Sequence, residues 1–347
     1  MKTNVFYLFV LALTILGCSS EHKQNCKQSA SYNDSSERND QYLGGIKIIP
    51  IQTPKGEFNV WTKRVGNNPT MKVLLLHGGP GMTHEIYESF DGYFPNAGIE
   101  YYYYDQLGSY YSDQPKDLSL WDLDRFVEEV EQVRQALGLD SSNFYLYGQS
   151  WGGLLGMQYA LKYQKHLKGL IVSNMVPSIP DYQAYSDEVL APQLDPAVFE
   201  EIMLYENKED YSNPRYMELL MNNYYTKHII RMPVSEWPEP LNRSFKHINH
   251  DVYVTMQGPS EFGVKGDATL KYWDVKDELK TINVPTLSIG ATHDTMDPKQ
   301  MEFIANEVQN GRFLLCPNGS HLAQFDDQKV YFEGLIEFIK DVDKGQF

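Results

Sequence analysis

The stretch Gly148-Gln149-Ser150-Trp151-Gly152-Gly153 decides how the rest of the chain is interpreted. It follows an apolar and aromatic run, 143–147, that is typical of a buried strand, and it precedes an apolar run, 154–161, that is typical of a buried helix. Glycines on both sides of Ser150 allow a turn that is too tight for larger side chains. The sequence therefore predicts a strand–turn–helix unit. It holds the Ser150 hydroxyl at the carboxyl end of a strand, beside helix N–H groups.

A Gly-x-Ser-x-Gly sequence between a strand and a helix is the nucleophile elbow of the α/β-hydrolase fold. A serine hydroxyl becomes a good nucleophile only when a base takes its proton and a third group orients that base. In this fold the partners follow the serine in the order Asp, then His, in loops after later strands. The alternative interpretation of the motif is a glycine-rich turn with a purely structural role.

Two later loops supply candidate partners for Ser150. The predicted strand 284–290 is followed by Asp294, and the predicted strand 312–316 is followed by His321. Parallel strands bring these loops to the same edge of the sheet as the serine. We therefore expect Asp294 to orient His321, and His321 to act first as a base and then as an acid.

Three other residues compete for these roles. Asp297 stands before Pro298, a pattern typical of a helix N-cap, and it is the substitute if Asp294 is not the acid. His77 opens a glycine loop and is interpreted as structural. His293 is adjacent to Asp294 in the chain and should point elsewhere.

The loop His77-Gly78-Gly79-Pro80-Gly81 carries almost no side chains and follows the predicted buried strand 71–76. A tetrahedral intermediate needs backbone N–H donors placed close to its oxyanion. Trp151 supplies one by its position after Ser150. We expect Gly79 to supply the other, the alternative being that the loop is only a tight turn.

The rest of the chain predicts a mostly parallel central sheet with helices on both faces. Residues 43–175 and 270–347 form this α/β-hydrolase core. Between them, residues 176–269 have a helical pattern punctuated by prolines, which predicts an inserted helical cap. The other predicted elements are strands at 46–51, 57–61, 99–105 and 167–173 and helices at 122–137 and 328–342.

The N-terminal region is predicted to be separate from the core. Residues 1–18 combine an early lysine, an apolar run and a closing Gly17-Cys18, which is typical of a secretory signal and similar to a bacterial lipobox. We expect Cys18 to carry lipid and to anchor the chain to a membrane, on the periplasmic or outer side of a bacterial envelope. An ordinary cleaved signal and an uncleaved anchor are the alternatives. Residues 19–42 are polar and predict a flexible tether.

Composition limits the remaining possibilities. The 347 residues, 42% of them hydrophobic, are enough for one sizeable core with an inserted subdomain. A formal net charge of −16 argues against binding to nucleic acid. The three cysteines predict no disulfide framework, and no cluster has metal-ligand spacing, so we expect neither a metal nor a cofactor.

Four of these motifs together resemble the proline iminopeptidase family, a serine aminopeptidase branch of the α/β-hydrolases, and in particular the tricorn-interacting aminopeptidase type. The resemblance runs from about residue 42 to the C-terminus and includes the cap stretch 253–262. The motifs are His77-Gly78-Gly79-Pro80-Gly81, Asp105-Gln106-Leu107-Gly108, Gly148-Gln149-Ser150-Trp151-Gly152-Gly153 and Gly319-Ser320-His321.

The resemblance implies a substrate and a residue that recognises it. In the family, a cap glutamate binds the free α-amino group of the substrate, and Glu261 lies in the matching segment, with Tyr253 as a second candidate. An ammonium that enters an apolar pocket needs a carboxylate partner. The implied activity is release of N-terminal proline or small apolar residues from short peptides. The alternatives are an esterase or amidase acting on non-peptide substrates, and a surface binding lipoprotein with an inactive site.

The chain departs from the family in two places. Thr295 stands where some members have a second acidic residue, and Ser109-Tyr110-Tyr111-Ser112 stands where relatives often have glycine and arginine. We expect both differences to affect substrate preference, and Thr295 to weaken binding of the amine.

Overall fold

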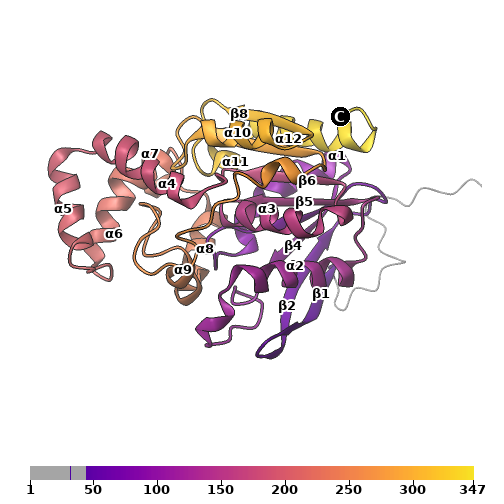
Figure 1. The fold of residues 1–347 in the computed structure, drawn as a ribbon, viewed down its shortest axis with the longest axis horizontal. Coiled ribbons are helices and arrows are strands. Elements are labelled where there is room, and N and C mark those ends of the chain that lie inside the picture. The colour runs from indigo at the N-terminus through magenta and orange to yellow at the C-terminus, as the bar shows by residue number, and fades with distance from the viewer. Residues whose placement is uncertain (1–31, 33–43) are drawn as a thin grey trace, which may run out of the picture. The chain divides into compact units, whose positions relative to one another are not determined.

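The computed structural model describes residue 32 and residues 44–347. In this part of the chain eight strands form one sheet, in the order β1-β2-β4-β3-β5-β6-β7-β8. The pairings of β1 with β2 and of β2 with β4 are antiparallel, and all the others are parallel (Figure 1). This confirms the predicted mostly parallel sheet. The strands are β1 Ile46–Thr53, β2 Gly56–Val65, β3 Lys72–Leu76, β4 Glu100–Asp105, β5 Phe144–Gln149, β6 Gly169–Ser173, β7 Thr286–Ala291 and β8 Gly311–Cys316.

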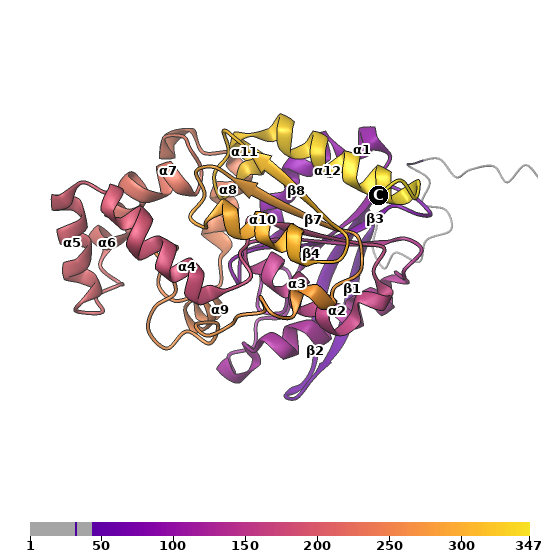
Figure 2. The ribbon, with the colours of Figure 1, turned by 45° about the horizontal axis from the view of Figure 1, so that its top comes forward.

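Helices cover both faces of the sheet (Figure 2). Because successive side chains of a strand point to opposite faces, Leu74 of β3 belongs to one apolar cluster and its neighbour Val73 to another. The Leu74 cluster includes side chains of α2 (Leu123–Leu137), α3 (Trp151–Tyr163) and α10 (Pro298–Glu307). The Val73 cluster includes side chains of η1 (His84–Gly92), α1 (Phe94–Ala97) and α12 (Gln328–Asp343).

Between β6 and β7 the described chain forms helices as far as Met256 and then runs without a helix to Leu279. Four of the prolines that punctuate this segment stand in the first turn of a helix, where the missing N–H is not needed by the helix. We call residues 176–269 the cap. Its α-helices are α4 Ile179–Tyr185, α5 Pro196–Glu206, α6 Pro214–Leu220, α7 Thr226–His228, α8 Glu239–His247 and α9 His250–Met256.

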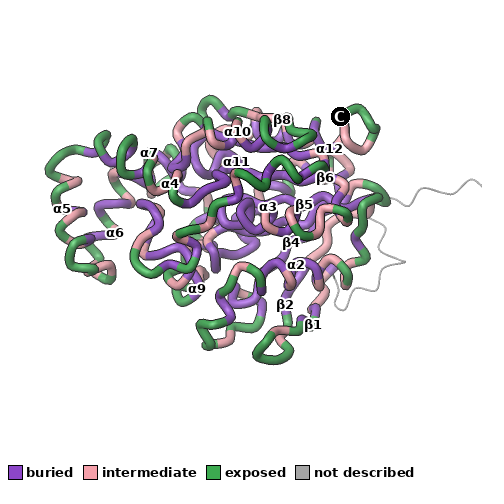
Figure 3. The backbone as a smooth tube through the Cα atoms, viewed as in Figure 1, coloured by how far each residue is buried: buried purple, intermediate pink, exposed green. Residues whose placement is uncertain are grey.

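One cap helix, α8, is tied closely to the core. Arg243 of α8 reaches two carboxylates of η1, with its Nη1 2.7 Å from Glu85 Oε1 and its Nη2 2.6 Å from Glu88 Oε2. His247 Nδ1 lies 2.8 Å from Glu85 Oε2, and the ring of Tyr110 stacks on the His247 ring. By contrast, α5 and α6 present much of their surface to solvent (Figure 3).

The segment 109–112, where the sequence differs from the glycine and arginine often found in relatives, lies next to α8, because Tyr110 stacks on His247. Tyr110 and Tyr111 lie at the contact between core and cap, where Tyr111 also stacks on His84. None of the residues 109–112 lines the cavity described below. The expectation that this loop acts on substrate preference therefore has no direct contact to support it.

The predicted signal peptide at 1–18, with Cys18, and nearly all of the predicted tether lie outside the described residues. Within the described residues, none of the helices is both long enough and apolar enough to cross a lipid bilayer.

Candidate active site

Ser150 lies at the turn between β5 and α3 with φ 55° and ψ −127°, a backbone conformation that residues other than glycine rarely adopt. The flanking glycines make this turn possible. A Cβ added to Gly148 would lie 1.9 Å from the Gly152 carbonyl oxygen, and one added to Gly152 would lie 2.1 Å from the Leu76 carbonyl oxygen. The motif is therefore fixed by steric contact with neighbouring backbone, as the sequence predicted.

The structure brings Asp294 and His321 together, from the loops after β7 and β8. His321 Nδ1 lies 2.7 Å from Asp294 Oδ1, and both residues are buried. Burial alone lowers the pKa of His321, but the nearby carboxylates of Asp294 and Glu261 outweigh it and hold that pKa above its usual value. Asp294 is thus placed to stabilise His321 as an imidazolium.

Asp297, the substitute acid, has a different role. Its Oδ1 accepts a hydrogen bond from the Lys299 N–H at 3.0 Å and caps the N-terminus of α10. His321 makes its carboxylate contact with Asp294 instead. The geometry therefore favours Asp294 as the acid of the site.

Thr295 lies behind the acid and the histidine. Its hydroxyl is 3.2 Å from Asp294 Oδ1 and 3.4 Å from His321 Nδ1, and the residue is fully buried. It does not line the cavity that holds Ser150. The expectation that Thr295 weakens amine binding has no support in this position, because the side chain faces the Asp294–His321 pair.

The predicted oxyanion donors, Gly79 and Trp151, belong to the two segments that meet at the nucleophile. Trp151 is the first residue of α3, so its N–H has no acceptor within the helix. Gly79 lines the cavity in the left-handed region, with φ 110°. A Cβ added to its neighbour Gly78 would lie 3.3 Å from the Ser150 Cβ, which shows how closely this glycine loop passes the serine.

His77 and Gln106 hold the glycine loop against the elbow. The buried His77 ring donates from Nδ1 to the Gly78 carbonyl at 2.9 Å and accepts the Gln106 N–H at Nε2, at 3.1 Å. Burial lowers the pKa of His77 to about 4, so the ring stays neutral near pH 7 and Nε2 remains an acceptor. The Trp151 indole N–H donates to Gln106 Oε1 at 2.9 Å. His77 is structural, and Gln106, which belongs to one of the family motifs quoted above, is a linking residue whose role the sequence did not predict.

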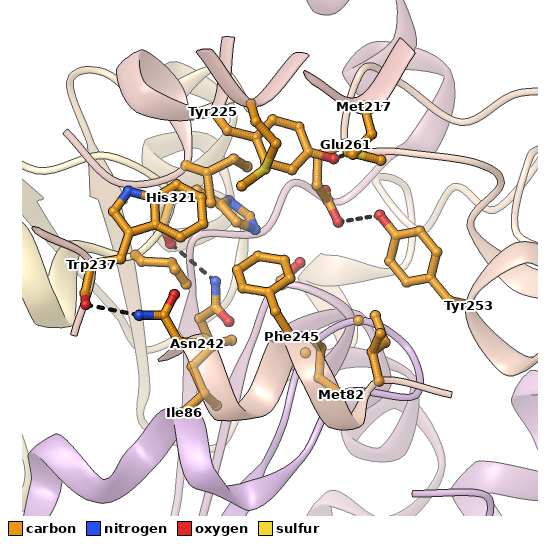
Figure 4. Close-up of a pocket in the computed structure, with 18 of the residues that line it drawn as sticks. Met82, Ile86, Met217, Tyr225, Trp237, Asn242, Phe245, Tyr253, Glu261 and His321 are labelled. Carbon is orange, nitrogen blue, oxygen red and sulfur yellow. Dashed lines mark hydrogen bonds between the residues drawn. The ribbon is translucent and has the colours of Figure 1, made fainter. Parts of the chain in front are cut away.

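Ser150, His321 and Glu261 open into one cavity of about 310 Å³ between core and cap (Figure 4). The core contributes the glycine loop, the elbow and the histidine loop. The cap contributes most of the apolar wall, including Met217, Tyr225, Val234, Trp237, Phe245 and Ile248.

Glu261 is held from several sides but keeps one oxygen unpaired. Its Oε1 accepts the Tyr253 hydroxyl at 2.6 Å, its N–H donates to the Tyr225 hydroxyl at 2.9 Å, and its carbonyl accepts the Tyr182 hydroxyl at 2.7 Å. Its Oε2 is buried and has no hydrogen-bond partner among the described residues. Burial raises the pKa of this carboxyl group. Figure 4 shows Tyr253 beside Glu261, so the structure brings both predicted amine-binding residues together.

The cap also contacts the loop that carries the histidine. The His321 N–H donates to the His228 carbonyl, and the Leu322 N–H donates to the Ile229 carbonyl, each at 2.9 Å. These bonds fix the register between the end of α7 and the histidine loop. No sequence motif signalled them, because backbone groups carry them.

His293 points away from the acid, as expected. It lines a second cavity that contains neither Ser150 nor His321, and its carbonyl accepts the His228 Nδ1–H at 3.0 Å. Among the described residues no group of three or more His, Cys, Asp or Glu side chains has the arrangement of a metal site.

Comparison with known proteins gives consistent results. Residues 72–328 match the family model of the alpha/beta hydrolase fold. The chain is 60% identical over 295 residues to a proline iminopeptidase of Flavobacterium johnsoniae, covering 85% of this chain and 98% of the relative. It is also 60% identical over 300 residues to one of Elizabethkingia meningoseptica, covering 86% and 100%. The crystal structure of a proline iminopeptidase from Mycobacterium smegmatis superposes with a TM-score of 0.77 at 25% identity, covering 87% and 100%.

Proposed function

The chain belongs to the proline iminopeptidase family of α/β-hydrolases, and we propose that it releases one N-terminal residue, proline or a small apolar one, from short peptides with a free amine. In this proposal Ser150 attacks the first carbonyl carbon while His321 takes its proton, and the Gly79 and Trp151 N–H groups stabilise the oxyanion. His321 then protonates the leaving amine, and water hydrolyses the acyl-enzyme by the same route. Asp294 orients the imidazole throughout.

The unpaired Oε2 of Glu261 is the observation that carries the proposal. A buried carboxylate oxygen without a donor is unfavourable, and a substrate ammonium would supply both the missing donor and the opposite charge. Ser150 opens into the same cavity, so a residue whose amine is bound at Glu261 can present its carbonyl to the serine. This arrangement favours cleavage after the first residue of a peptide.

The cavity wall supports an apolar first residue. Met82, Ile86, Trp237 and Phe245 surround the space beside the serine with apolar side chains. A charged side chain placed there would lose its hydration without a partner, whereas a proline ring or a small apolar side chain loses little. These contacts support proline and small apolar residues as the preferred N-terminal residues.

A panel of tripeptides tests the proposal. Peptides that begin with proline, alanine or aspartate are supplied with a free or an acetylated N-terminus, and the released residue is identified by mass spectrometry. We expect single-residue release from the free proline and alanine peptides only. Glu261→Gln should lower that rate roughly thirtyfold or more, while the control Glu236→Gln, on an exposed residue of the cap, should not. Equal release from acetylated peptides would contradict the proposal.

An esterase or amidase activity is the second candidate, favoured by the apolar lining of the cavity. Such a lining can also accept a simple acyl group that has no amine. A butyryl ester discriminates between the two candidates. Turnover of this ester with kcat/KM equal to or above that of the free aminoacyl substrates, and unchanged in Glu261→Gln, would favour the second candidate.

We also propose that the chain is lipid-anchored through Cys18 in a bacterial envelope. The support is the sequence alone, an apolar run that ends in Gly17-Cys18 and is followed by a polar stretch. Cys18→Ser should abolish incorporation of labelled palmitate and move the protein from the membrane to the soluble fraction. Cys26→Ser, in the same polar stretch, is the matched control and should change neither. Unaltered partitioning of Cys18→Ser would contradict the proposal.

A further inference from the structure

Asn174, the residue directly after β6, lies between the nucleophile strand and the strand that leads to the acid. Its N–H donates to the Ile289 carbonyl of β7 at 2.8 Å. The preceding residue, Ser173, accepts the Ser150 N–H at 3.0 Å. The end of β6 is therefore bonded on one side to the elbow and on the other side to the strand before Asp294.

The backbone of Asn174 is held in an uncommon conformation. Its φ is 50°, in the left-handed region, and the residue is fully buried. Asparagine tolerates this region better than most side chains, and a buried residue keeps it only where the surroundings determine its position.

The side-chain amide of Asn174 joins the loops of both the acid and the base. Its Nδ2 donates to Asp294 Oδ2 at 2.7 Å and to the Ser320 carbonyl at 3.1 Å. Both partners are acceptors, so the amide must present its NH₂ group to them. Its Oδ1 correspondingly accepts the Ser173 hydroxyl at 2.8 Å.

A chain of buried hydroxyl groups holds the Asn174 amide in this orientation. Ser173 Oγ lies 2.8 Å from the Tyr331 hydroxyl, which lies 2.5 Å from the Tyr147 hydroxyl. Ser173, Tyr331 and Tyr147 are all fully buried. A chain of satisfied hydrogen bonds in a low-dielectric interior resists rotation of each member.

The two oxygens of Asp294 have different donors. Oδ1 faces His321 Nδ1 at 2.7 Å and also accepts the Met296 N–H at 3.2 Å. For Oδ2, the donor among the described residues is Asn174 Nδ2. We propose that Asn174 is a positioning residue: its amide fixes the rotation of the Asp294 carboxylate and its spacing from the loop that carries His321. This inference rests on the serine mechanism proposed above.

The consequence appears when His321 takes the proton of Ser150. The imidazolium is stabilised only while Asp294 Oδ1 remains in line with Nδ1. Without the amide of Asn174, the carboxylate can rotate, and a misplacement of about 1 Å can lower a rate about a hundredfold. The pKa of His321 should then fall, because burial lowers it and a rotated Asp294 carboxylate raises it less.

Asn174→Gly is the informative variant, because glycine accepts the left-handed backbone while removing the amide. We expect kcat to fall roughly ten- to hundredfold with KM changed less than twofold. The acid limb of the kcat/KM profile should move to lower pH. The rate at which a fluorophosphonate labels Ser150 should fall by a similar factor, although the same number of sites is labelled at completion.

Two further variants separate positioning from folding. Asn174→Asp keeps the shape but places an acceptor against Asp294 and Ser320, so it should lose at least as much activity as Asn174→Gly. Glu209→Gly is the control for backbone strain, because Glu209 has φ 53° on an exposed turn, and it should behave as wild type.

Unchanged labelling kinetics and an unchanged pH profile in Asn174→Gly would overturn the inference. So would a loss of activity matched by an equal loss of labelled sites, since that loss reports folding alone. Labelling does not depend on the natural substrate, so these outcomes differ from a failure of the proposed function. That failure would appear as a wild type that labels normally but releases no N-terminal residue.

Discussion

Asp294 and Glu261 are two carboxylates that both raise the pKa of His321, and they are partnered differently. Asp294 has donors on both oxygens, from His321 on Oδ1 and from Asn174 on Oδ2. Glu261 has a donor on Oε1, from Tyr253, while its Oε2 is buried and unpaired among the described residues. The acid–base pair thus has its partners within the chain, whereas the proposed amine site keeps one oxygen that a substrate ammonium could pair.

The largest effect should come from removing the nucleophile. Ser150→Ala should lower kcat by roughly 10⁴ to 10⁶, since the residual rate comes only from binding and the oxyanion donors. The variant should unfold at a temperature close to that of the wild type, because alanine fits the same turn. Kinetics and calorimetry check the two statements. Full activity, or fluorophosphonate labelling at another serine, would remove Ser150 from the site.

The next largest effect should come from changing Asp294, the carboxylate with donors on both oxygens. Asp294→Asn should lower kcat about 10⁴-fold, because the amide no longer holds His321 in the required tautomer. Asp297→Asn should leave kcat nearly unchanged, since asparagine also caps a helix and Asp297 does not contact His321. Steady-state kinetics of the two variants measure the ratio, and the reverse ranking would move the acid to Asp297.

The Glu261 carboxylate can be weakened at Tyr253, the residue that donates to its Oε1 among the described residues. Tyr253→Phe removes the hydrogen bond to Glu261 Oε1 without removing the carboxylate. A hydrogen bond to a charged group contributes about 1.5–3 kcal/mol, so kcat/KM on a free aminoacyl substrate should fall roughly ten- to a hundredfold. Tyr182→Phe is the comparison variant, because its hydroxyl donates its hydrogen bond to the Glu261 carbonyl. An equal loss in both variants would argue for a general packing effect.

The smallest effect should be a change in the pKa of His321, on which the charges of both Asp294 and Glu261 act. Burial lowers the pKa of His321, but Asp294 and then Glu261 raise it, so the acid limb of kcat/KM should lie above pH 6.5. Glu261→Gln removes one of the carboxylate charges that raise the pKa of His321, and the limb should therefore move to lower pH. A pH profile on an ester without an amine measures this shift separately from substrate binding. A shift to higher pH would contradict the assigned sign.

The sequence predicted the parts of the site that short motifs encode. Ser150 and the glycine loop were recognisable because steric contact with backbone leaves no alternative to glycine at positions such as Gly148 and Gly152. The order of the loops after the later strands predicted His321 and Asp294, with Asp297 as the substitute acid, and the structure distinguished the two acids. The role of Glu261 was predicted from the family resemblance, because the residues around it form no pattern that indicates a binding site.

Other features depend on contacts between distant segments. Asn174 follows a strand like many loop residues, and nothing in its neighbourhood signals that its amide reaches both Asp294 and Ser320. The direction of the Thr295 side chain could not be predicted for a related reason. Its side chain turns toward the histidine rather than into the cavity, and a linear motif does not define that direction.

The most direct test of the account compares four kcat/KM values: wild type and Glu261→Gln, each on a free aminoacyl substrate and on its acetylated form. If the substrate ammonium completes Glu261, each single change removes the same contact. Each should then cost about 2–5 kcal/mol, or roughly thirtyfold and more. The account predicts that the two changes together lose little more than either alone. Losses that multiply, or equal rates on the free and acetylated substrates, would contradict it.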